Sequence, residues 1–309
     1  MPGSHAGSPA GPLSGPISYR PFTADDVPAA HALSVKVAWP HRADDWRLLE
    51  SAGTGFVAEQ NAQMIGTGLC WRYGPERASL GMVIVSPEHQ GQGIGRQLMQ
   101  RLIAALGERA ILLHATPAGK PLYEKLGFRA VGTVDQHQGT VFQPPLISLP
   151  PGERLRPLGT NDAPRLAELA SRACGLDRQA LFPLLLDVAD GIALDRDGEL
   201  LGFALFRRFG RGFTIGPVVA PDAPDSSRAK ALISHWLALN EGVFVRIDTP
   251  GDSGLTQWLE GLGMPGVDTV VKMVRGDASG VLVGETAPDA AGSDALTPKA
   301  FGLISQALG

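Results

Sequence analysis

The chain has 309 residues, of which 44% are hydrophobic and 19% are charged, and its formal net charge is −4 at pH 7. This composition suits a globular protein of two ordinary domains, and the negative balance argues against nucleic acid as a partner. No apolar run reaches the ~20 residues of a membrane-spanning helix, so we expect no membrane contact. The two cysteines show no metal-binding spacing and cannot build a disulfide framework, which predicts a cytoplasmic protein without a metal site.

The first half of the chain alternates between strand and helix patterns. Residues 1–16 are rich in Gly, Pro, Ser and Ala and lack the basic region of a signal peptide, so we predict a disordered leader. Residues 17–20 predict a short strand, and Thr23 caps a helix with Asp26 in the capping-box position. The later elements are a helix at 42–51, strands at 55–59, 64–72 and 78–86, a helix at 93–106, a strand at 110–113, a helix at 120–126, and closing strands at 128–134 and 140–142. This order predicts a mixed α/β (α+β) sheet.

The chain also repeats itself. Segment 19–33, YRPFTADDVPAAHAL, resembles segment 155–169, LRPLGTNDAPRLAEL, at an offset of 136 residues. Segment 55–66 resembles segment 191–202 at the same offset, and between later blocks the offset falls to 134. Because the offset holds in separated blocks, the sequence predicts two copies of one fold.

A linker separates the copies. Residues 143–153, QPPLISLPPGE, contain four prolines, which predicts a stiff, extended connector. We therefore expect one domain at 17–148, a second at 149–276, and a linker with a C-terminal helix at 277–309. Each domain is expected to be a mixed, mostly antiparallel sheet flanked by helices.

Residues 86–100, SPEHQGQGIGRQLMQ, place three alternating glycines between an apolar strand pattern and a helix pattern. Backbone N–H groups at the start of a helix lack partners and attract anions, so a phosphate-bearing cofactor is one interpretation. A dinucleotide-binding loop would need a glycine where Arg96 stands, and a P-loop would need Gly-Lys-Ser/Thr, which is missing. A tight turn that needs only glycine dihedrals is the other interpretation.

The pattern Gln90-x-x-Gly93-x-Gly95 after the strand MVIVSP resembles the acyl-CoA loop of the GNAT superfamily of N-acetyltransferases. Segment 121–128, PLYEKLGF, resembles the family's Tyr-x-x-x-Gly-Phe segment. The resemblance covers nearly all of the first copy, and the paired copies resemble tandem GNAT proteins. It implies an enzyme that moves an acetyl group from acetyl-CoA, as cosubstrate, to a primary amine of a small molecule by direct attack. No metal is implied, and we expect a monomer or a homodimer.

The resemblance also implies where acetyl-CoA would bind. Backbone N–H groups of the loop would hold the pyrophosphate, and Thr116 stands where many family members have an asparagine that contacts the cofactor. The loop residues are Gln90, Gly91, Gln92, Gly93, Ile94, Gly95 and Arg96, and the strand residues that would bond the pantetheine arm are Val83, Ile84 and Val85. A backbone N–H near Val83 would polarise the thioester carbonyl. Tyr123 matches the family's general acid by position, with a core tyrosine as the alternative.

The sequence leaves alternatives open for the general base and for the acceptor pocket. The strand at 78–85 has no carboxylate. The candidate bases are Glu59, His114, Asp44 and Asp45, each with a cap, surface or scaffold role as the alternative. Segment 38–46, AWPHRADDW, contains two tryptophans and His41. It predicts either an aromatic wall for the acceptor or packing against the second copy.

The second copy has lost the features of the site. The three glycines and their neighbours map onto Asp225, Ser226, Ser227, Arg228 and Ala229. Tyr123 maps onto Leu259, whereas apolar helix positions persist. We therefore predict a degenerate second copy that closes the acceptor pocket or stabilises the first. Two further functions stay open: acetylation of a protein lysine or N-terminus, and an acyl-CoA-binding sensor without turnover.

Overall fold

The computed structural model describes residues 15–277 and 296–309. The predicted leader, apart from its last two residues, and nearly all of the predicted linker after residue 276 lie outside this range. The elements of the first copy are β1 (Ser18–Pro21), η1 (Ala24–Asp26), α1 (Val27–Lys36), α2 (Ala43–Ser51), β2 (Thr54–Gln60), β3 (Gln63–Tyr73), β4 (Arg77–Val85), η2 (Pro87–His89), α3 (Ile94–Leu106), β5 (Ala110–Ala115), α4 (Lys120–Lys125) and β6 (Arg129–Thr140).

The second copy repeats this order. Its elements are β7 (Glu153–Pro157), α5 (Ala163–Cys174), α6 (Phe182–Leu186), β8 (Ala189–Arg196), β9 (Glu199–Phe209), β10 (Gly212–Pro221), α7 (Ser227–Leu239), β11 (Phe244–Pro250), α8 (Thr256–Gly261) and β12 (Gly266–Arg275), and a last strand, β13 (Pro298–Gly302), follows. The fold class is confirmed as a mixed sheet flanked by helices, and the element order bears out the internal repeat.

Both copies begin with the same ion pair between an arginine of the first strand and an aspartate at the start of the first helix. The Arg20 guanidinium donates to the Asp26 carboxylate at 2.7 Å, and the same carboxylate accepts the Thr23 backbone N–H at 2.8 Å. In the second copy, Arg156 donates to Asp162 at 2.7 Å. A carboxylate placed this way satisfies an N–H group that the helix leaves without a partner, and so fixes where the first helix begins.

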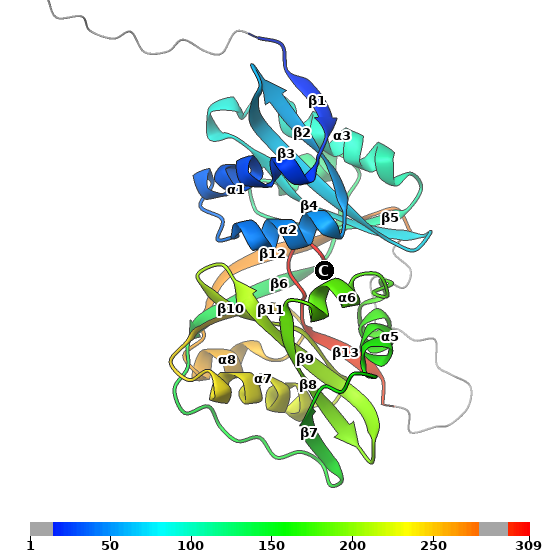
Figure 1. Cartoon of the computed structure of the whole chain (residues 1–309), viewed down its shortest axis with the longest axis vertical. Coiled ribbons are helices and arrows are strands. Elements are labelled where there is room, and N and C mark those ends of the chain that lie inside the picture. The colour runs from blue at the N-terminus through cyan, green and yellow to red at the C-terminus, as the bar shows by residue number, and fades with distance from the viewer. Residues whose placement is uncertain (1–14, 278–295) are drawn as a thin grey trace, which may run out of the picture.

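The described strands join into one 13-stranded sheet whose order is β1-β2-β3-β4-β5-β12-β6-β11-β10-β9-β8-β7, with β13 paired to β10. The two copies therefore exchange strands: β12 lies between β5 and β6, and β6 lies between β12 and β11 (Figure 1). In the β6–β12 ladder, Val134 pairs with Val270, its own counterpart 136 residues later. The two copies are thus related by a pseudo-twofold axis at this pair.

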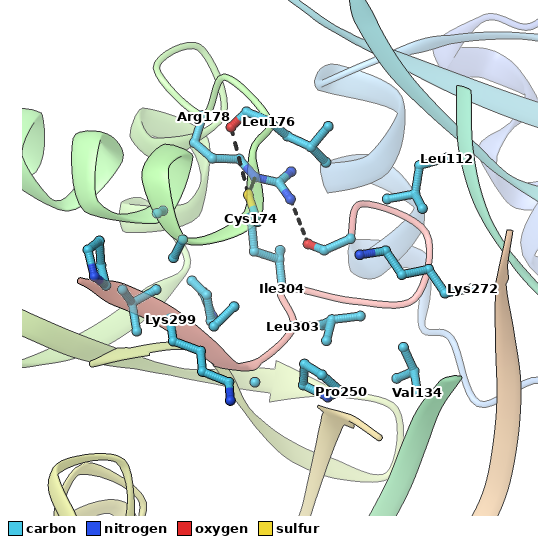
Figure 2. Close-up of a pocket in the computed structure, with 18 of the residues that line it drawn as sticks. Leu112, Val134, Cys174, Leu176, Arg178, Pro250, Lys272, Lys299, Leu303 and Ile304 are labelled. Atoms are coloured by element: carbon cyan, nitrogen blue, oxygen red, sulfur yellow. Dashed lines mark hydrogen bonds between the residues drawn. The ribbon is translucent and has the colours of Figure 1, made fainter. Parts of the chain in front are cut away.

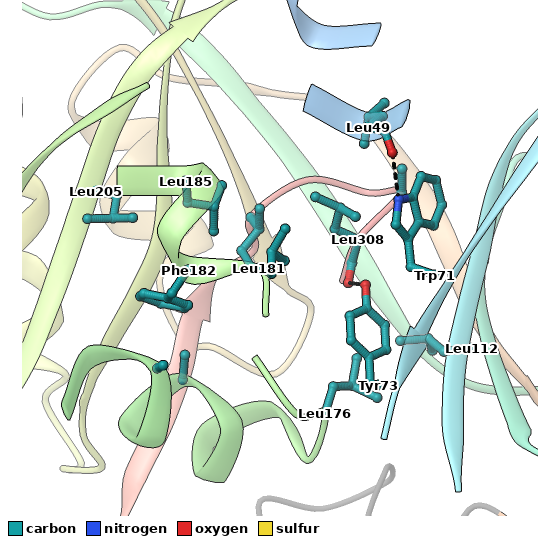
Figure 3. Packing of buried hydrophobic residues seen from close by; sticks show 14 of the residues in the cluster. Leu49, Trp71, Tyr73, Leu112, Leu176, Leu181, Phe182, Leu185, Leu205 and Leu308 are labelled. Carbon is teal, nitrogen blue, oxygen red and sulfur yellow. Dashed lines mark hydrogen bonds between the residues drawn. The ribbon is translucent and has the colours of Figure 1, made fainter. Parts of the chain in front are cut away.

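Helices cover both faces of the sheet. On β3, the position of a side chain at Gly68 is 2.8 Å from Leu102 of α3, whereas the next residue, Leu69, packs with Val27 of α1 in another core cluster. The helix pairs α1/α2 and α5/α6 share this second cluster, in which Trp71 and Tyr73 lie close to Leu308 and Leu176 (Figure 3). The C-terminal segment therefore packs between the copies.

Two expected elements differ in the structure. In place of the closing strands predicted at 128–134 and 140–142, there is one continuous strand, β6, which ends at Thr140, because β11 and β12 pair with it along almost its whole length. The prediction of a C-terminal helix is wrong. Residues 298–302 form β13, because the open edge of β10 supplies hydrogen-bond partners for them. Phe301 and Ile304 of this segment are buried.

Candidate active site

The glycine loop is open on its outer side. Gly91 and Gly93 both have φ of 79°, and a Cβ at either would meet no atom within 4 Å. Gly93 is the N-cap of α3, so unpaired N–H groups of the first helical turn face this open space. Gly95 differs, because a Cβ there would lie 3.6 Å from Leu122 and 3.7 Å from Val85. These are ordinary contact distances, so an added methyl group at Gly95 would fit against its neighbours.

The edge of β4 opens beside this loop. β4 pairs with β5 only through Arg77, Ser79 and the residue between them, and the strands then separate. On its other edge, β4 pairs with β3 as far as Val85. The separation leaves the backbone groups of the second half of β4 available for an extra extended segment, which is how peptides and similar ligands add to a sheet edge.

A bulge lies at the point where β4 leaves β5. Thr67 pairs with Ile84, and Leu69 pairs with Gly81, so Met82 and Val83 oppose one residue of β3. Met82 has φ of 53°, the left-handed region that a bulky side chain rarely adopts. The bulge redirects the backbone of Val83. The family resemblance places near this residue the N–H group that would polarise the thioester carbonyl. An open edge that runs into an open N–H loop fits an extended ligand with a phosphate at one end, such as an acyl-CoA.

The other predicted cofactor contacts lie near this edge. The Gln90 side-chain amide donates to the Val85 carbonyl at 3.3 Å, and thereby ties the loop to the end of β4. Gln92 and Arg96 are exposed, and Ile94 is buried beneath the loop. Thr116 follows β5, and its hydroxyl accepts the Gly119 N–H at 3.3 Å. Thr116 therefore shapes the turn into α4.

Tyr123 lies on α4, with its ring packed over Gly119 and edge-on to Phe128 at 6.2 Å between centroids. Burial raises the pKa of Tyr123 to about 12, so the phenol stays protonated at neutral pH. No other described residue forms a hydrogen bond with its hydroxyl. The ring is held by packing, and the hydroxyl remains available as a donor.

Three of the four candidate bases have structural partners. Glu59 accepts a hydrogen bond from Arg20 at 2.6 Å, and Asp44 pairs with Arg47 at 2.5 Å on an exposed helix face. Asp45 is buried, accepts the Arg42 backbone N–H at 2.8 Å, and so caps α2. These contacts explain each carboxylate without a role in proton transfer.

His114 is placed differently. It lies on β5, two residues beyond the last residue paired with β4, on the face that carries α1 and α2. Its Nδ1 is 2.7 Å from the Gln306 carbonyl oxygen, which can only accept, so Nδ1 carries the proton and Nε2 has a free lone pair. Burial lowers the pKa of His114 to about 4, so the ring is neutral at pH 7.

The aromatic segment between α1 and α2 packs against the second copy. His41 lies edge-on to Phe209 of β9, with 5.3 Å between ring centroids. The Gly210 N–H donates to Asp45 at 3.3 Å. Trp46 is fully buried and donates to Ser34 at 3.2 Å. His41 therefore contacts the second copy and Trp46 belongs to the core, so the packing interpretation accounts for both residues.

The equivalent loop in the second copy supplies its own anion. The Asp225 carboxylate accepts the Ser227 N–H at 3.1 Å at the start of α7. Arg228 forms a buried ion pair with Glu153 at 2.6 Å, and Leu259, at the position of Tyr123, is fully buried. In this copy the Ser227 N–H is already bonded to Asp225, and Leu259 has no hydroxyl to match that of Tyr123.

Two further losses in the second copy were missed from sequence. The β10 bulge matches the β4 bulge, and it places Pro217, which has no N–H, where the first copy has Val83. The edge of β10 that matches the open edge of β4 is occupied, because Val218 to Pro221 pair with β13. The proline was visible in the sequence at the known offset, whereas no signal marked β13.

Two other kinds of site are absent from residues 15–277 and 296–309. No helix there is long and apolar enough to cross a membrane. No group of three or more His, Cys, Asp or Glu side chains there is placed to hold a metal ion. Cys70 and Cys174 are both free thiols.

Protein-family models and a known protein that resemble this chain are all acetyltransferases. Models of the acetyltransferase (GNAT) domain match residues 51–130 and residues 166–280. The uncharacterized N-acetyltransferase YitH of Bacillus subtilis is 34% identical over 177 residues, which cover 56% of this chain and 61% of that protein. The match thus spans less than two thirds of the relative's length.

Solved structures share the fold over most of the chain. A proposed acetyltransferase from Pyrococcus horikoshii has a TM-score of 0.72 and 19% identity, and the match covers 99% of this chain and 100% of that one. A tandem GNAT protein from the clavulanic acid biosynthesis pathway has a TM-score of 0.64 and 16% identity, with 84% and 98% covered. A GCN5-related N-acetyltransferase from Sphaerobacter thermophilus has a TM-score of 0.59 and 17% identity, with 84% and 95% covered.

The family models match both copies. The open glycine loop, the Met82–Val83 bulge and the separation of β4 from β5 all lie in the first copy. The chain belongs to the GNAT acetyltransferase family and carries two GNAT domains in tandem.

Proposed function

We propose that this protein transfers an acetyl group from acetyl-CoA to a primary amine of a small molecule, and that the first copy alone performs the reaction. The observation that carries this proposal is the open edge of β4, which begins at the Met82–Val83 bulge and runs into the loop at Gly91 and Gly93. A pantetheine arm would bond this edge, including Ile84 and Val85, as an added strand. The pyrophosphate would take the loop N–H groups.

Acetyl-CoA supplies the activated acyl group as a thioester. The Val83 N–H would polarise the thioester carbonyl. The Tyr123 hydroxyl would donate to the sulfur as it leaves. Because the pKa of Tyr123 is about 12, we expect a hydrogen bond that stabilises the developing thiolate more than complete proton transfer.

His114 is the candidate base that we favour. Its Nε2 lone pair, its place in the separated part of β5 and its neutral ring together support this role. A pKa of about 4 makes it a weak base, so the acceptor amine would have to arrive largely as the free base.

The C-terminal segment favours a small acceptor over a protein chain. The Ala307 carbonyl accepts the Ser79 hydroxyl at 3.1 Å, and a Cβ at Gly81 would lie 3.2 Å from Ala307. Tyr73 donates to the Leu308 carbonyl at 2.9 Å. These contacts cover part of β4 on the face of α1 and α2, and so narrow the approach to the bulge.

The test is calorimetric titration of the full chain with acetyl-CoA, followed by mass spectrometry of products from a panel of primary amines. We expect one binding site per chain and a mass increase of one acetyl group on a small amine. Two sites would contradict the silent second copy. Binding without any acetylated product would favour the acyl-CoA sensor, and no binding would exclude both functions.

A further inference from the structure

A cavity of about 320 Å³ lies between the two copies (Figure 2). Strands β5, β6 and β12 form one wall, α5 forms another, and β13 with the residues after it forms a third. This volume is within the range of small-molecule sites, which is roughly 300–1,000 Å³. The cavity is therefore large enough for a small molecule.

His114 joins this cavity to the proposed site of acetyl transfer, because it is one of the lining residues. Ser79 of β4 pairs with Leu112 of β5. His114 lies two residues beyond Leu112 and is therefore level with Gly81, which directly precedes the bulge of β4. The two strands have separated at this point. An amine that lies in the cavity and reaches His114 would thus adjoin the Val83 N–H, on which we place the thioester carbonyl.

The Nε2 atom of His114 is accessible to such an amine. The Gln306 carbonyl holds only the other ring nitrogen, Nδ1, at 2.7 Å. Nε2 of His137 is buried without a hydrogen-bond partner, whereas Nε2 of His114 is not enclosed in this way. The histidine therefore presents a fixed lone pair at the boundary between the cavity and the separated strands.

Both copies contribute to the walls. The first copy supplies Leu112 and Val134, and the second supplies Ala170 and Ala173 of α5, while Ile304 of the C-terminal segment lies between them. The labelled side chains of Leu112, Val134 and Ile304 surround the same space in Figure 2. A molecule with its amine at His114 would therefore rest its other end against the second copy.

The charged groups of the described lining are engaged or lie at the rim. The Arg178 guanidinium donates to two backbone carbonyls of the C-terminal segment at 2.8 Å each. Lys299 pairs with Asp222 at 3.6 Å, Asp222 is 55% exposed, and Asp252 is exposed. Lys272 also has an interaction partner. These groups serve contacts within the protein, so the surface left for an occupant is mostly apolar.

An apolar cavity discriminates between the two protonation states of an amine. Burial penalises the charged ammonium far more than the neutral amine. His114 requires the same neutral form, because burial makes its ring too weak a base to accept a proton from an ammonium. The cavity would thus favour the acceptor in the form that can attack the thioester.

We propose that this cavity is the acceptor pocket, and that it takes a primary amine whose remaining body is apolar. The amino group faces His114, and the body lies against α5 of the second copy. This inference rests on the proposed function, and it makes the second copy the part of the chain that selects the acceptor.

Ethylamine, hexylamine and hexane-1,6-diamine separate the effect of an apolar body from that of a second charge. Each is titrated into the full chain in a calorimeter at pH 9, and kcat/KM for its acetylation is measured at saturating acetyl-CoA. Each buried CH₂ group is worth roughly fourfold, so we expect hexylamine to exceed ethylamine by at least ~10-fold. The diamine should fall at least ~10-fold below hexylamine, because its second ammonium would have to leave water.

Ala173→Leu adds three carbon atoms to the α5 wall and tests the part played by the second copy. We expect kcat/KM for hexylamine to fall at least ~10-fold, since the added side chain takes the space of the apolar body. The kcat/KM for ethylamine and the Kd for acetyl-CoA should stay within twofold, which a general loss of structure would not allow. Ala180→Leu makes the same change at an exposed position after α5 and should alter none of these values.

The outcomes separate this pocket from the proposed function. Similar kcat/KM values for all three amines, or a preference for the diamine, would overturn the pocket and leave acetyl transfer intact. Binding of hexylamine that Ala173→Leu weakens, without any acetylated product, would keep the pocket and overturn the transfer. Neither binding nor product would overturn both. If Ala173→Leu does not fold, the three amines on the unmodified chain still decide.

Discussion

Tyr123 is the residue whose replacement tests the proposed chemistry most directly. Tyr123→Phe keeps the ring that packs over Gly119 and against Phe128 and removes only the hydroxyl. We expect kcat to fall by about 100-fold, a typical contribution of a positioned proton donor. The Kd for acetyl-CoA should stay within twofold, because the hydroxyl contributes only when the sulfur leaves.

The pH profile of the unmodified chain gives a check on the same residue. With a pKa of about 12, Tyr123 stays protonated through pH 10, so the rate should not decline on its account below that pH. Steady-state kinetics from pH 6 to pH 10 with a free-base amine would show this. Equal losses in kcat and in acetyl-CoA affinity for Tyr123→Phe would instead indicate a purely structural tyrosine.

His41 gives a prediction about acid stability. Burial, with Arg246 and Arg207 nearby, lowers the pKa of His41 to about 3 in the folded chain, against about 6.5 for an unperturbed histidine. The unfolded chain therefore binds a proton between pH 6.5 and pH 3 that the folded chain does not. Stability is complete above pH 6.5 and falls with acidification by about 1.4 kcal/mol per pH unit for this residue.

His41→Phe should remove this acid sensitivity. The Nδ1 of His41 is buried without a hydrogen-bond partner, and a phenyl ring preserves the edge-on contact with Phe209. Thermal unfolding at pH 7, 6, 5 and 4.5 measures the effect. The melting temperature of the variant should fall less steeply than that of the unmodified chain, and parallel curves would contradict the assignment.

Single residues differ in how far the sequence predicts their conformation and their contacts. The sequence marks Gly93 and Gly95 alike, but only Gly93 has a positive φ, which favours glycine, whereas Gly95 contacts ordinary side-chain neighbours. Pro217 could have been found, since the offset that maps the glycine loop also maps Val83 onto it. The contact of Asp45 with Gly210 and that of His114 with Gln306 could not, because these partners lie far along the chain.

The loop between β4 and α3 allows two glycines to be compared. Gly93→Val would force a β-branched side chain into a left-handed conformation, at a cost of ~1–2 kcal/mol, and into the space that a phosphate would take. Gly95→Ala adds a methyl group at normal contact distance from Leu122 and Val85. We expect the first variant to bind acetyl-CoA at least ~10-fold more weakly and the second to bind it unchanged.

Calorimetric titration of both variants beside the unmodified chain provides the measurement, with thermal unfolding as a check of folding. The comparison is informative because the two positions are two residues apart in one loop. Similar losses for both variants would mean that the loop is sensitive to any added side chain. The assignment of a phosphate to the side of Gly93 would then be wrong.

At the scale of elements, most helices and strands of the first copy were predictable, and their partners were not. Hydrophobic periodicity and capping residues place α2, α3 and β2 to β5 within a few residues of their positions. The same signals split β6 in two and made β13 a helix, because periodicity carries no information on which distant strand completes a ladder. For this reason the sequence does not predict that the two copies exchange β6 and β12.

The exchange of β6 and β12 makes the two copies one cooperative unit. Leu146 in the linker is fully exposed, so a protease site inserted there would be cut without disturbing either copy. After cleavage we expect the two fragments to elute together in size-exclusion chromatography, because β6 remains paired on both edges with strands of the other fragment. Calorimetry of the cut protein should still show a single unfolding transition.

Uncut protein is the control, and denaturant is the means of separating the fragments. Elution of two independent folded fragments would contradict the strand order and would restore the simple division into domains at 17–148 and 149–276. That division remains a prediction of the sequence. The strand order makes it a division of the chain and not of the sheet.

The pairing of Val134 with Val270 also has a consequence for biosynthesis. β6 is complete at residue 140, but its partner β12 ends only at residue 275. At the usual ~5–20 residues per second of translation, a ribosome needs roughly 7–27 s to supply that partner. During this interval, β5 and β6 of a nascent chain have unpaired edges, and β12 from a neighbouring nascent chain on the same messenger could fill the gap. Weaker translation initiation, which spaces nascent chains further apart on the messenger, should therefore raise the yield of correctly paired single chains relative to intertwined ones.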